Sequence, residues 1–167
     1  MAELKIDKDL DNKTLTLTYV ADGPKDKVWR AYADKEWFEK WWGPEGWETT
    51  TKVFDFRSGG VVHYGMKCVD ENQGEWFGQT SWGLMEIESV DEGNSFTYQD
   101  FFSDENGGKN AELPALTITN TFTEQDGKTT IVSRSVADSA EQIEELLKMG
   151  MLEGFESQLH KLDSLVG

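Results

Sequence analysis

The sequence predicts an α+β fold in which a curved antiparallel sheet of about six to seven strands wraps a long C-terminal helix. Three observations predict it. A first strand-like segment precedes two short helix-like segments, about six further strand-like segments follow, and a long amphipathic segment comes last. A sheet of that size with one apolar face needs a cover, and only the last helix is large enough. We therefore expect that helix inside the bend of the sheet, with a cavity where the concave face is left unfilled.

The first strand and the two short helices come early in the chain. Thr14–Val20 alternates apolar residues with threonines, which is the period of a half-buried strand. Apolar residues at helical spacing follow Gly23-Pro24, and Asp34 is suited to cap a second helix that Gly43-Pro44 ends. That second helix carries an aromatic cluster of Trp37, Phe38, Trp41 and Trp42. This cluster either packs in the core or lines the mouth of a cavity, and the sequence leaves both alternatives open.

The middle of the chain is typical of antiparallel hairpins. From Thr49 to Val136 the composition is strand-like, and Asp126-Gly127 favours a two-residue hairpin turn. The clearest alternation places threonines on one face and an enclosed set on the other. The enclosed set is Leu116, Ile118, Asn120 and Phe122. A buried amide at Asn120 must find hydrogen bonds from the protein, from water or from a ligand.

The last helix begins at a capping-box signature, because Gln142 follows Ser139 by three residues. One apolar stripe then continues, so we expect a single helix of roughly 26 residues. The stripe comprises Ile143, Leu147, Met151, Phe155, Leu159, Leu162 and Val166. Gly150 and Gly154 fall within this segment, where each glycine costs about 1 kcal/mol relative to alanine. Close contact with the sheet and space for a ligand are the two explanations.

Composition excludes several classes of function. The 16 basic and 32 acidic residues give a formal net charge of -16, which opposes binding to nucleic acid or to anionic membranes. The lone Cys68 excludes an intramolecular disulfide, and neither a signal peptide nor an apolar run of about 20 residues is present. We expect one cytoplasmic domain over residues 1–167, a monomer or weak dimer, with no metal and no cofactor.

Several short segments together resemble a known family. They are Val28–Ala31, Trp41–Pro44, Asp55–Gly60, Gly83–Ile87, and Gly150–Phe155 followed by Leu159 and Leu162. In this order they are similar to the activator-of-heat-shock-protein-90-ATPase-like family. That family belongs to the larger superfamily of steroidogenic-acute-regulatory (START) lipid-transfer domains, birch-pollen-allergen-like proteins and polyketide cyclases. The resemblance covers nearly all of the chain.

The resemblance implies a helix-grip fold with a pocket between the sheet and the C-terminal helix. It also implies a link to chaperones and the stress response, since family members include co-chaperone domains. The eukaryotic co-chaperones carry a separate domain that docks on the chaperone, and nothing in this sequence corresponds to it. Fold alone does not settle function in such a family.

Candidate binding residues follow from the aromatic load and from strand parity. The chain contains seven tryptophans, nine phenylalanines and four tyrosines, and such residues are typical of a pocket for a flat or hydrophobic ligand. The candidates are Trp41, Tyr64, Met66, Tyr98, Asn120, Met151 and Phe155. Asp100 shares the parity of Tyr98, but an inward carboxylate is costly unless it is paired, so we expect it to be exposed near its strand end. His63 alternates with apolar neighbours and is expected to face solvent.

The leading functional hypothesis is binding of a small hydrophobic or aromatic molecule between the concave sheet and Gly150–Phe155. The first alternative is a co-chaperone-like interaction domain that regulates a chaperone ATPase through its acidic surface. The second is a cyclase- or dehydratase-like enzyme that uses Tyr98, Asp100 or Asn120 in the same cavity. Enzymatic chemistry has no positive sequence signal, because phosphate-binding loops, metal-spaced cysteines and nucleophile elbows do not occur.

Overall fold

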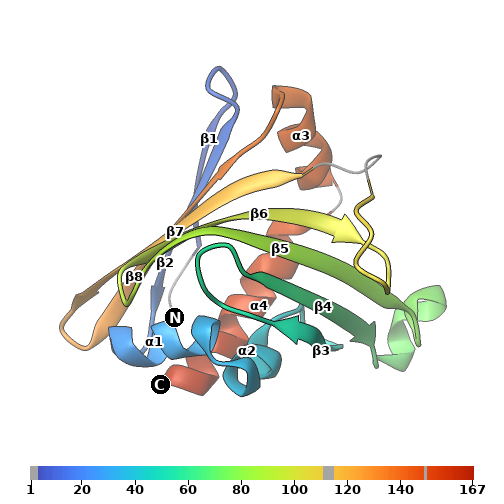
Figure 1. The fold of residues 1–167 in the computed structure, drawn as a ribbon, viewed down its shortest axis with the longest axis horizontal. Coiled ribbons are helices and arrows are strands. Elements are labelled where there is room, and N and C mark those ends of the chain that lie inside the picture. Colours follow the sequence, from blue (N-terminus) through green and yellow to red (C-terminus); the bar gives the residue numbers. More distant parts are fainter. Residues whose placement is uncertain (1–3, 111–114, 149) are drawn as a thin grey trace.

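The computed structural model describes residues 4–110, 115–148 and 150–167. Over those residues it contains one antiparallel sheet of eight strands in the order β1-β2-β8-β7-β6-β5-β4-β3 (Figure 1). The strands are β1 (Lys5–Asp9), β2 (Thr14–Ala21), β3 (Trp47–Phe54), β4 (Val61–Cys68), β5 (Thr80–Asp91), β6 (Ser95–Ser103), β7 (Leu116–Gln125) and β8 (Lys128–Val136). The helices are α1 (Lys25–Ala33), α2 (Lys35–Trp41), the 3-10 helix η1 (Glu71–Trp76), α3 (Ala140–Lys148) and α4 (Met151–Val166). The predicted α+β helix-grip architecture is confirmed.

The sheet has one strand more than predicted. β1 precedes the expected first strand and pairs with β2 along its whole length. Its side chains are all exposed, and Ile6 is the apolar residue among four charged ones. Sequence periodicity reports burial, so a fully exposed edge strand left no alternation to detect.

The sheet bends because two strands carry β-bulges. The register shifts between Thr51 and Val53 in β3 and between Ile87 and Ser89 in β5, and each shift adds local twist. The turn between β7 and β8 is the predicted two-residue hairpin. Its residues Asp126 and Gly127 have φ of 54° and 77°, the left-handed values that such a turn requires.

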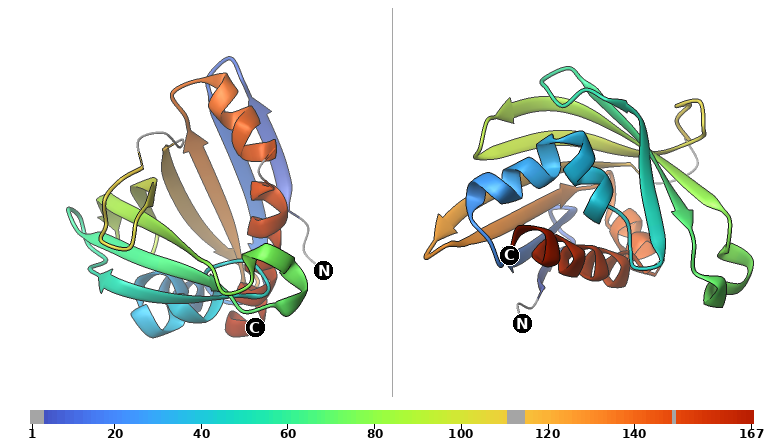
Figure 2. Two further views of the ribbon diagram at one scale, coloured as in Figure 1. Left: turned by 90° about the vertical axis from the view of Figure 1, so that its right-hand side faces the viewer. Right: turned by 90° about the horizontal axis from the view of Figure 1, so that it is seen from below.

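Three helices lie against the concave side of the bent sheet. Viewed from below, α1 and α2 lie beside α4, and the strands pass behind them (Figure 2). The second helix begins where predicted, since the Asp34 carboxylate accepts hydrogen bonds from the backbone N–H groups of Glu36 and Trp37. The last turns of α4 bury Leu159, Leu162 and Val166 completely.

The expectation of one continuous C-terminal helix was wrong. α3 ends at Lys148, α4 begins at Met151, and Gly150 between them has a φ of 83°. This left-handed backbone ends a right-handed helix and favours glycine. The apolar stripe hid the break because its spacing continues across it. The predicted start is confirmed, since the Ser139 hydroxyl accepts from the backbone N–H of Gln142 at 3.2 Å.

The core is divided into a large and a small hydrophobic cluster. Aromatic rings dominate the large one, where Tyr32, Trp41, Phe96 and Phe122 are almost completely buried. Trp41, Tyr32 and Trp42 meet edge-to-face, and Trp42 stacks on Phe38. The small cluster comprises Leu15, Leu17, Ala137 and Ile143, with Leu147, Met151 and Phe155 among the partly buried residues packed against it.

Two glycine substitutions distinguish a broken helix from a continuous one. Gly150→Ala should lower the free energy of unfolding by about 1–2 kcal/mol, because alanine is strained at a φ of 83°. Gly154→Ala should raise it by about 0.5–1 kcal/mol, because residue 154 is helical and an added Cβ would meet Pro44 at an ordinary 3.8 Å. Urea unfolding measures both. Stabilisation by both variants would contradict the break at Gly150.

Candidate functional site

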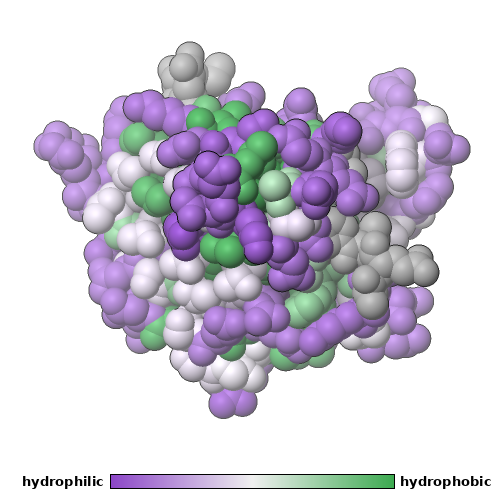
Figure 3. All heavy atoms as spheres, turned by 90° about the horizontal axis from the view of Figure 1, so that it is seen from above, coloured by the Kyte–Doolittle hydropathy of each residue, from purple (hydrophilic) through white to green (hydrophobic). Residues whose placement is uncertain are grey.

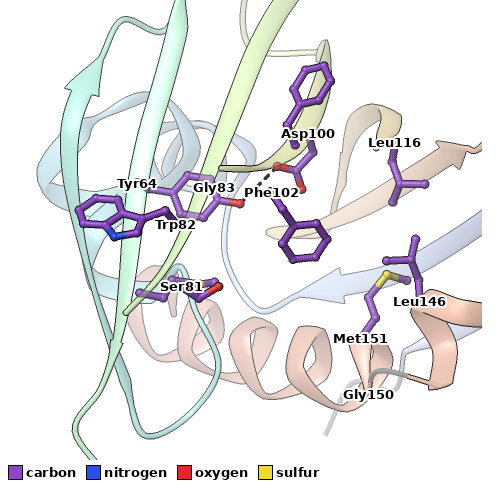
Figure 4. A pocket seen from close by; sticks show the side chains of 12 residues that line it. Tyr64, Ser81, Trp82, Gly83, Asp100, Phe102, Leu116, Leu146, Gly150 and Met151 are labelled. Atoms are coloured by element: carbon purple, nitrogen blue, oxygen red, sulfur yellow. Dashed lines mark hydrogen bonds between the residues drawn. The ribbon is translucent and has the colours of Figure 1, made fainter. Parts of the chain in front are cut away.

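A cavity lies between the concave face of the sheet and the two C-terminal helices. It has two adjoining compartments of about 280 Å³ and 240 Å³. The residues that line both compartments are Tyr64, Met66, Asp100, Phe102, Leu116 and Met151. Figure 4 shows the first compartment, with Leu146 of α3 and Met151 of α4 on the helical side and Asp100 and Phe102 on the sheet side. The space is therefore bounded by strands and helices far apart in the sequence.

A glycine in the sheet helps to leave this space open. Gly83 of β5 lies in register between Tyr64 of β4 and Phe102 of β6, so the three residues form one row across the concave face. A Cβ added at Gly83 would overlap the Tyr64 ring. The missing side chain therefore gives the tyrosine room to lie across the row with its hydroxyl toward β6. The Trp82 ring next to it points away from the cavity (Figure 4).

A hydrogen-bonded polar pair lies in this apolar wall. The Tyr64 hydroxyl donates to Oδ1 of Asp100 at 3.2 Å, and the Trp42 side chain donates to the same hydroxyl. In the sheet register Asp100 is flanked by Met85 and Leu116, which offer it no polar group. Burial raises the pKa of Asp100 to about 7, although the hydrogen bond from Tyr64 acts in the opposite direction. Asp100 thus titrates near neutrality.

Both tyrosines of the cavity remain neutral. Burial, together with the nearby Asp100 charge, raises the pKa of Tyr64 well above its usual range. The same two causes raise the pKa of Tyr98, whose hydroxyl is hydrogen-bonded by the Asn120 side chain. These hydroxyls can therefore act as hydrogen-bond donors and acceptors, but not as anions.

The turn after α2 is fastened to α4 and forms the end of the second compartment. The Gln158 side chain accepts from the backbone N–H of Gly43 at 2.8 Å, and Nζ of Lys161 donates to the Gly43 carbonyl at 3.0 Å. These bonds fix Trp42 and Pro44, which line the second compartment beside Gln158. The turn and the helix therefore form one wall.

The structure brings five of the seven predicted binding residues together. They are Tyr64, Met66, Tyr98, Met151 and Phe155, which all line the cavity. Trp41 and Asn120 are buried elsewhere in the core. The Trp41 indole N–H donates to the Ala31 carbonyl at 2.8 Å, and Asn120 contacts Tyr98. Protein partners therefore satisfy both groups, and their contact with a ligand stays a prediction.

Two sequence expectations about polar residues were wrong. Asp100 is half-buried rather than exposed at its strand end, because it lines the cavity and its carboxylate accepts a hydrogen bond from Tyr64 of β4. His63 is only 4% exposed, because its Nε2 lies 3.0 Å from the Asp104 carbonyl and its ring packs near Trp82. In both cases the enclosing residues lie far away in the sequence, so alternation along one strand gave no signal.

Sequence reasoning also missed cavity residues that carry small or ordinary side chains. Ser133 and Ser135 share the parity of buried Ile131 on β8, which is the signal that could have found them. Phe102 shares the parity of Tyr98 on β6 and could have been found in the same way. Leu146 had no such signal, because α3 was expected to continue into α4.

Other classes of site have little support in the described part of the chain. No helix there is long and apolar enough to span a bilayer, and no three His, Cys, Asp or Glu side chains are grouped as metal ligands. On the face seen from above, hydrophilic residues are widespread and hydrophobic ones form separated patches (Figure 3). The cavity is the feature with the clearest binding geometry.

Comparisons with known proteins agree with this architecture. A family model described as "Activator of Hsp90 ATPase homolog 1-like protein" matches residues 22–167. The crystal structure of protein Ms6760 from Mycobacterium smegmatis is 36% identical, with a TM-score of 0.86, over 100% of this chain and 98% of that one. A solution structure from Arthrobacter aurescens is 25% identical, with a TM-score of 0.86, over 97% and 90% of the two chains. A comparison with curated proteins found no match.

The Asp100 pKa predicts how stability depends on pH. The folded protein holds this proton up to about pH 7, whereas the ordinary carboxyl pKa is 3.8, so stability falls as pH rises through that window. Asp100→Asn is neutral throughout and should raise the free energy of unfolding by about 1–2 kcal/mol above pH 7, or about 2–8 °C in Tm. Little change is expected near pH 4.

Asp104 provides the contrast for this measurement. Backbone N–H groups of Gly108 and Asn106 lower its pKa, so its contribution is present above its ordinary pKa and is lost as pH falls. Asp104→Asn should therefore destabilise the protein at neutral pH. Thermal unfolding of the two variants across pH checks both signs. A loss of stability in Asp100→Asn above pH 7 would contradict the buried-acid assignment.

Proposed function

The chain belongs to the activator of Hsp90 ATPase homolog 1-like family, and from this premise we propose that it binds a small hydrophobic or aromatic molecule in the cavity. The family and its fold support a ligand-binding or regulatory domain in general terms. The finer proposal places the molecule between the concave sheet and the segment from Gly150 to Phe155.

One observation carries the proposal: a largely apolar cavity contains a single hydrogen-bonded carboxyl–hydroxyl pair. Ligand pockets usually measure about 300–1,000 Å³ and combine apolar walls with a few polar groups that orient the ligand. The two compartments, of about 280 Å³ and 240 Å³, share six lining residues, and each is close to the lower end of this range. Apolar side chains such as Phe102, Leu116 and Met151 would supply the contact area, while Tyr64 and Asp100 would orient one polar atom.

Binding can be tested with flavonoids, sterols and acyl chains. We expect members of one class to raise Tm and to change tryptophan fluorescence, because Trp42 lines the second compartment. Gly154→Trp should abolish this binding, because residue 154 lines the same compartment and an indole there would occupy it. Gly154→Ala is the matched control and should bind normally. Unchanged affinity in a folded Gly154→Trp variant would refute the placement.

Proton-transfer catalysis in the cavity is the second candidate, and the near-neutral pKa of Asp100 favours it. A general acid or base needs such a pKa and must reach the reacting proton of its substrate. Mass spectrometry of compounds that bind would separate the two functions. Catalysis is indicated if the wild type converts a compound and Asp100→Asn still binds that compound but no longer converts it. Compounds that the wild type binds and leaves unchanged indicate binding alone.

A further inference from the structure

Asp100 is the only charged side chain among the described residues that line the two compartments. Its hydrogen-bond partner is the neutral Tyr64 hydroxyl, at 3.2 Å. Within the described ranges no lysine, arginine or histidine forms an ion pair with it. A carboxylate held in an apolar wall without a counter-ion is costly, so a bound cation would stabilise the ionised form of Asp100.

The groups that face Asp100 from the surrounding elements are neutral. Tyr64 comes from β4 and Tyr98 from its own strand, and burial keeps both hydroxyls protonated. The residues that line the cavity from the other elements include Ser81 of β5, Leu116 of β7, Ser133 and Ser135 of β8, Leu146 of α3, and Met151 and Phe155 of α4. None of these side chains can neutralise a carboxylate.

Two lysines lie over aromatic rings of β5 and β6, and each is already paired with a glutamate. Nζ of Lys52 lies over the Trp82 ring and 3.5 Å from Glu105, and Nζ of Lys109 lies over the Phe101 ring and 2.9 Å from Glu86. Trp82 and Phe101 alternate with the inward residues of β5 and β6, so these lysines are on the other face of the sheet. They offer Asp100 no direct partner.

We propose that the ligand is an apolar molecule with a basic nitrogen, whose protonated amine pairs with the Asp100 carboxylate while its hydrocarbon part fills the apolar walls. This inference rests on the proposed binding function. The formal net charge of -16 also favours the approach of cations over anions. A carboxylic acid of the same shape would meet a like charge and is disfavoured.

Three bicyclic probes of the same carbon skeleton test the charge preference: 1-naphthylmethylamine, 1-naphthalenemethanol and 1-naphthoic acid. Calorimetry at about pH 8.5, where Asp100 is ionised, should show the amine binding at least about tenfold more tightly than the alcohol, and the acid more weakly than both. At about pH 5.5 the preference should shrink, because Asp100 is then mostly protonated while the amine keeps its charge.

Two variants with the same change in net charge provide the matched control. Asp100→Asn should reduce amine affinity to that of the alcohol, while Glu92→Gln, at an exposed turn outside the cavity, should leave the preference intact. Amine binding near pH 7 should also release protons, because a cation favours ionised Asp100, whereas alcohol binding should not. Calorimetry in buffers of different ionisation enthalpy measures this release.

The outcomes separate this inference from the function on which it rests. Suppose that the alcohol binds and that Gly154→Trp blocks this binding. If the amine then binds no more tightly than the alcohol, or if its preference survives Asp100→Asn, the amine assignment is overturned and the binding function stands. Failure of all three probes and of every screened compound to bind would overturn both. Amine preference that depends on Asp100 and on pH, with proton release, would establish the inference.

Discussion

The cavity depends on one row of the sheet in which a glycine separates two aromatic residues. Gly83 leaves the position between Tyr64 and Phe102 empty, and the Tyr64 ring uses part of that room. The ring's position brings its hydroxyl to Asp100, which would otherwise have only apolar neighbours in the sheet register. A single missing side chain therefore influences both the free volume and the polar group that faces it.

The other aromatic side chains pack densely in the neighbouring region. Trp41 and Tyr32 fill the space under α1 and α2, and Trp42 extends from that packed region to the Tyr64 hydroxyl. Hydrogen bonds from Gln158 and Lys161 hold the turn at Gly43 against α4. The polar pair is thus supported by a dense core on one side and faces free volume on the other, as a preorganised binding site requires.

The sequence predicted the fold where a segment's own periodicity reports its surroundings. Alternation predicted the enclosed face of β7, where Ile118, Asn120 and Phe122 are buried. The helical stripe predicted that Met151 and Phe155 face the sheet, and both line the cavity. It could not predict features set by distant neighbours or by one backbone angle. The enclosure of Asp100 depends on strands from three parts of the chain, and the break at Gly150 depends on a single φ that leaves the apolar stripe unchanged.

The break at Gly150 divides the C-terminal helices between two cores of unequal size. α3 buries Ile143 in the small cluster, whereas the end of α4 is anchored in the large one through Leu159, Leu162 and Val166. A segment with fewer buried apolar partners opens at a lower free energy than the whole fold unfolds. Leu146 belongs to that weaker segment, so we expect this wall of the cavity to open at a lower free energy than the aromatic core unfolds.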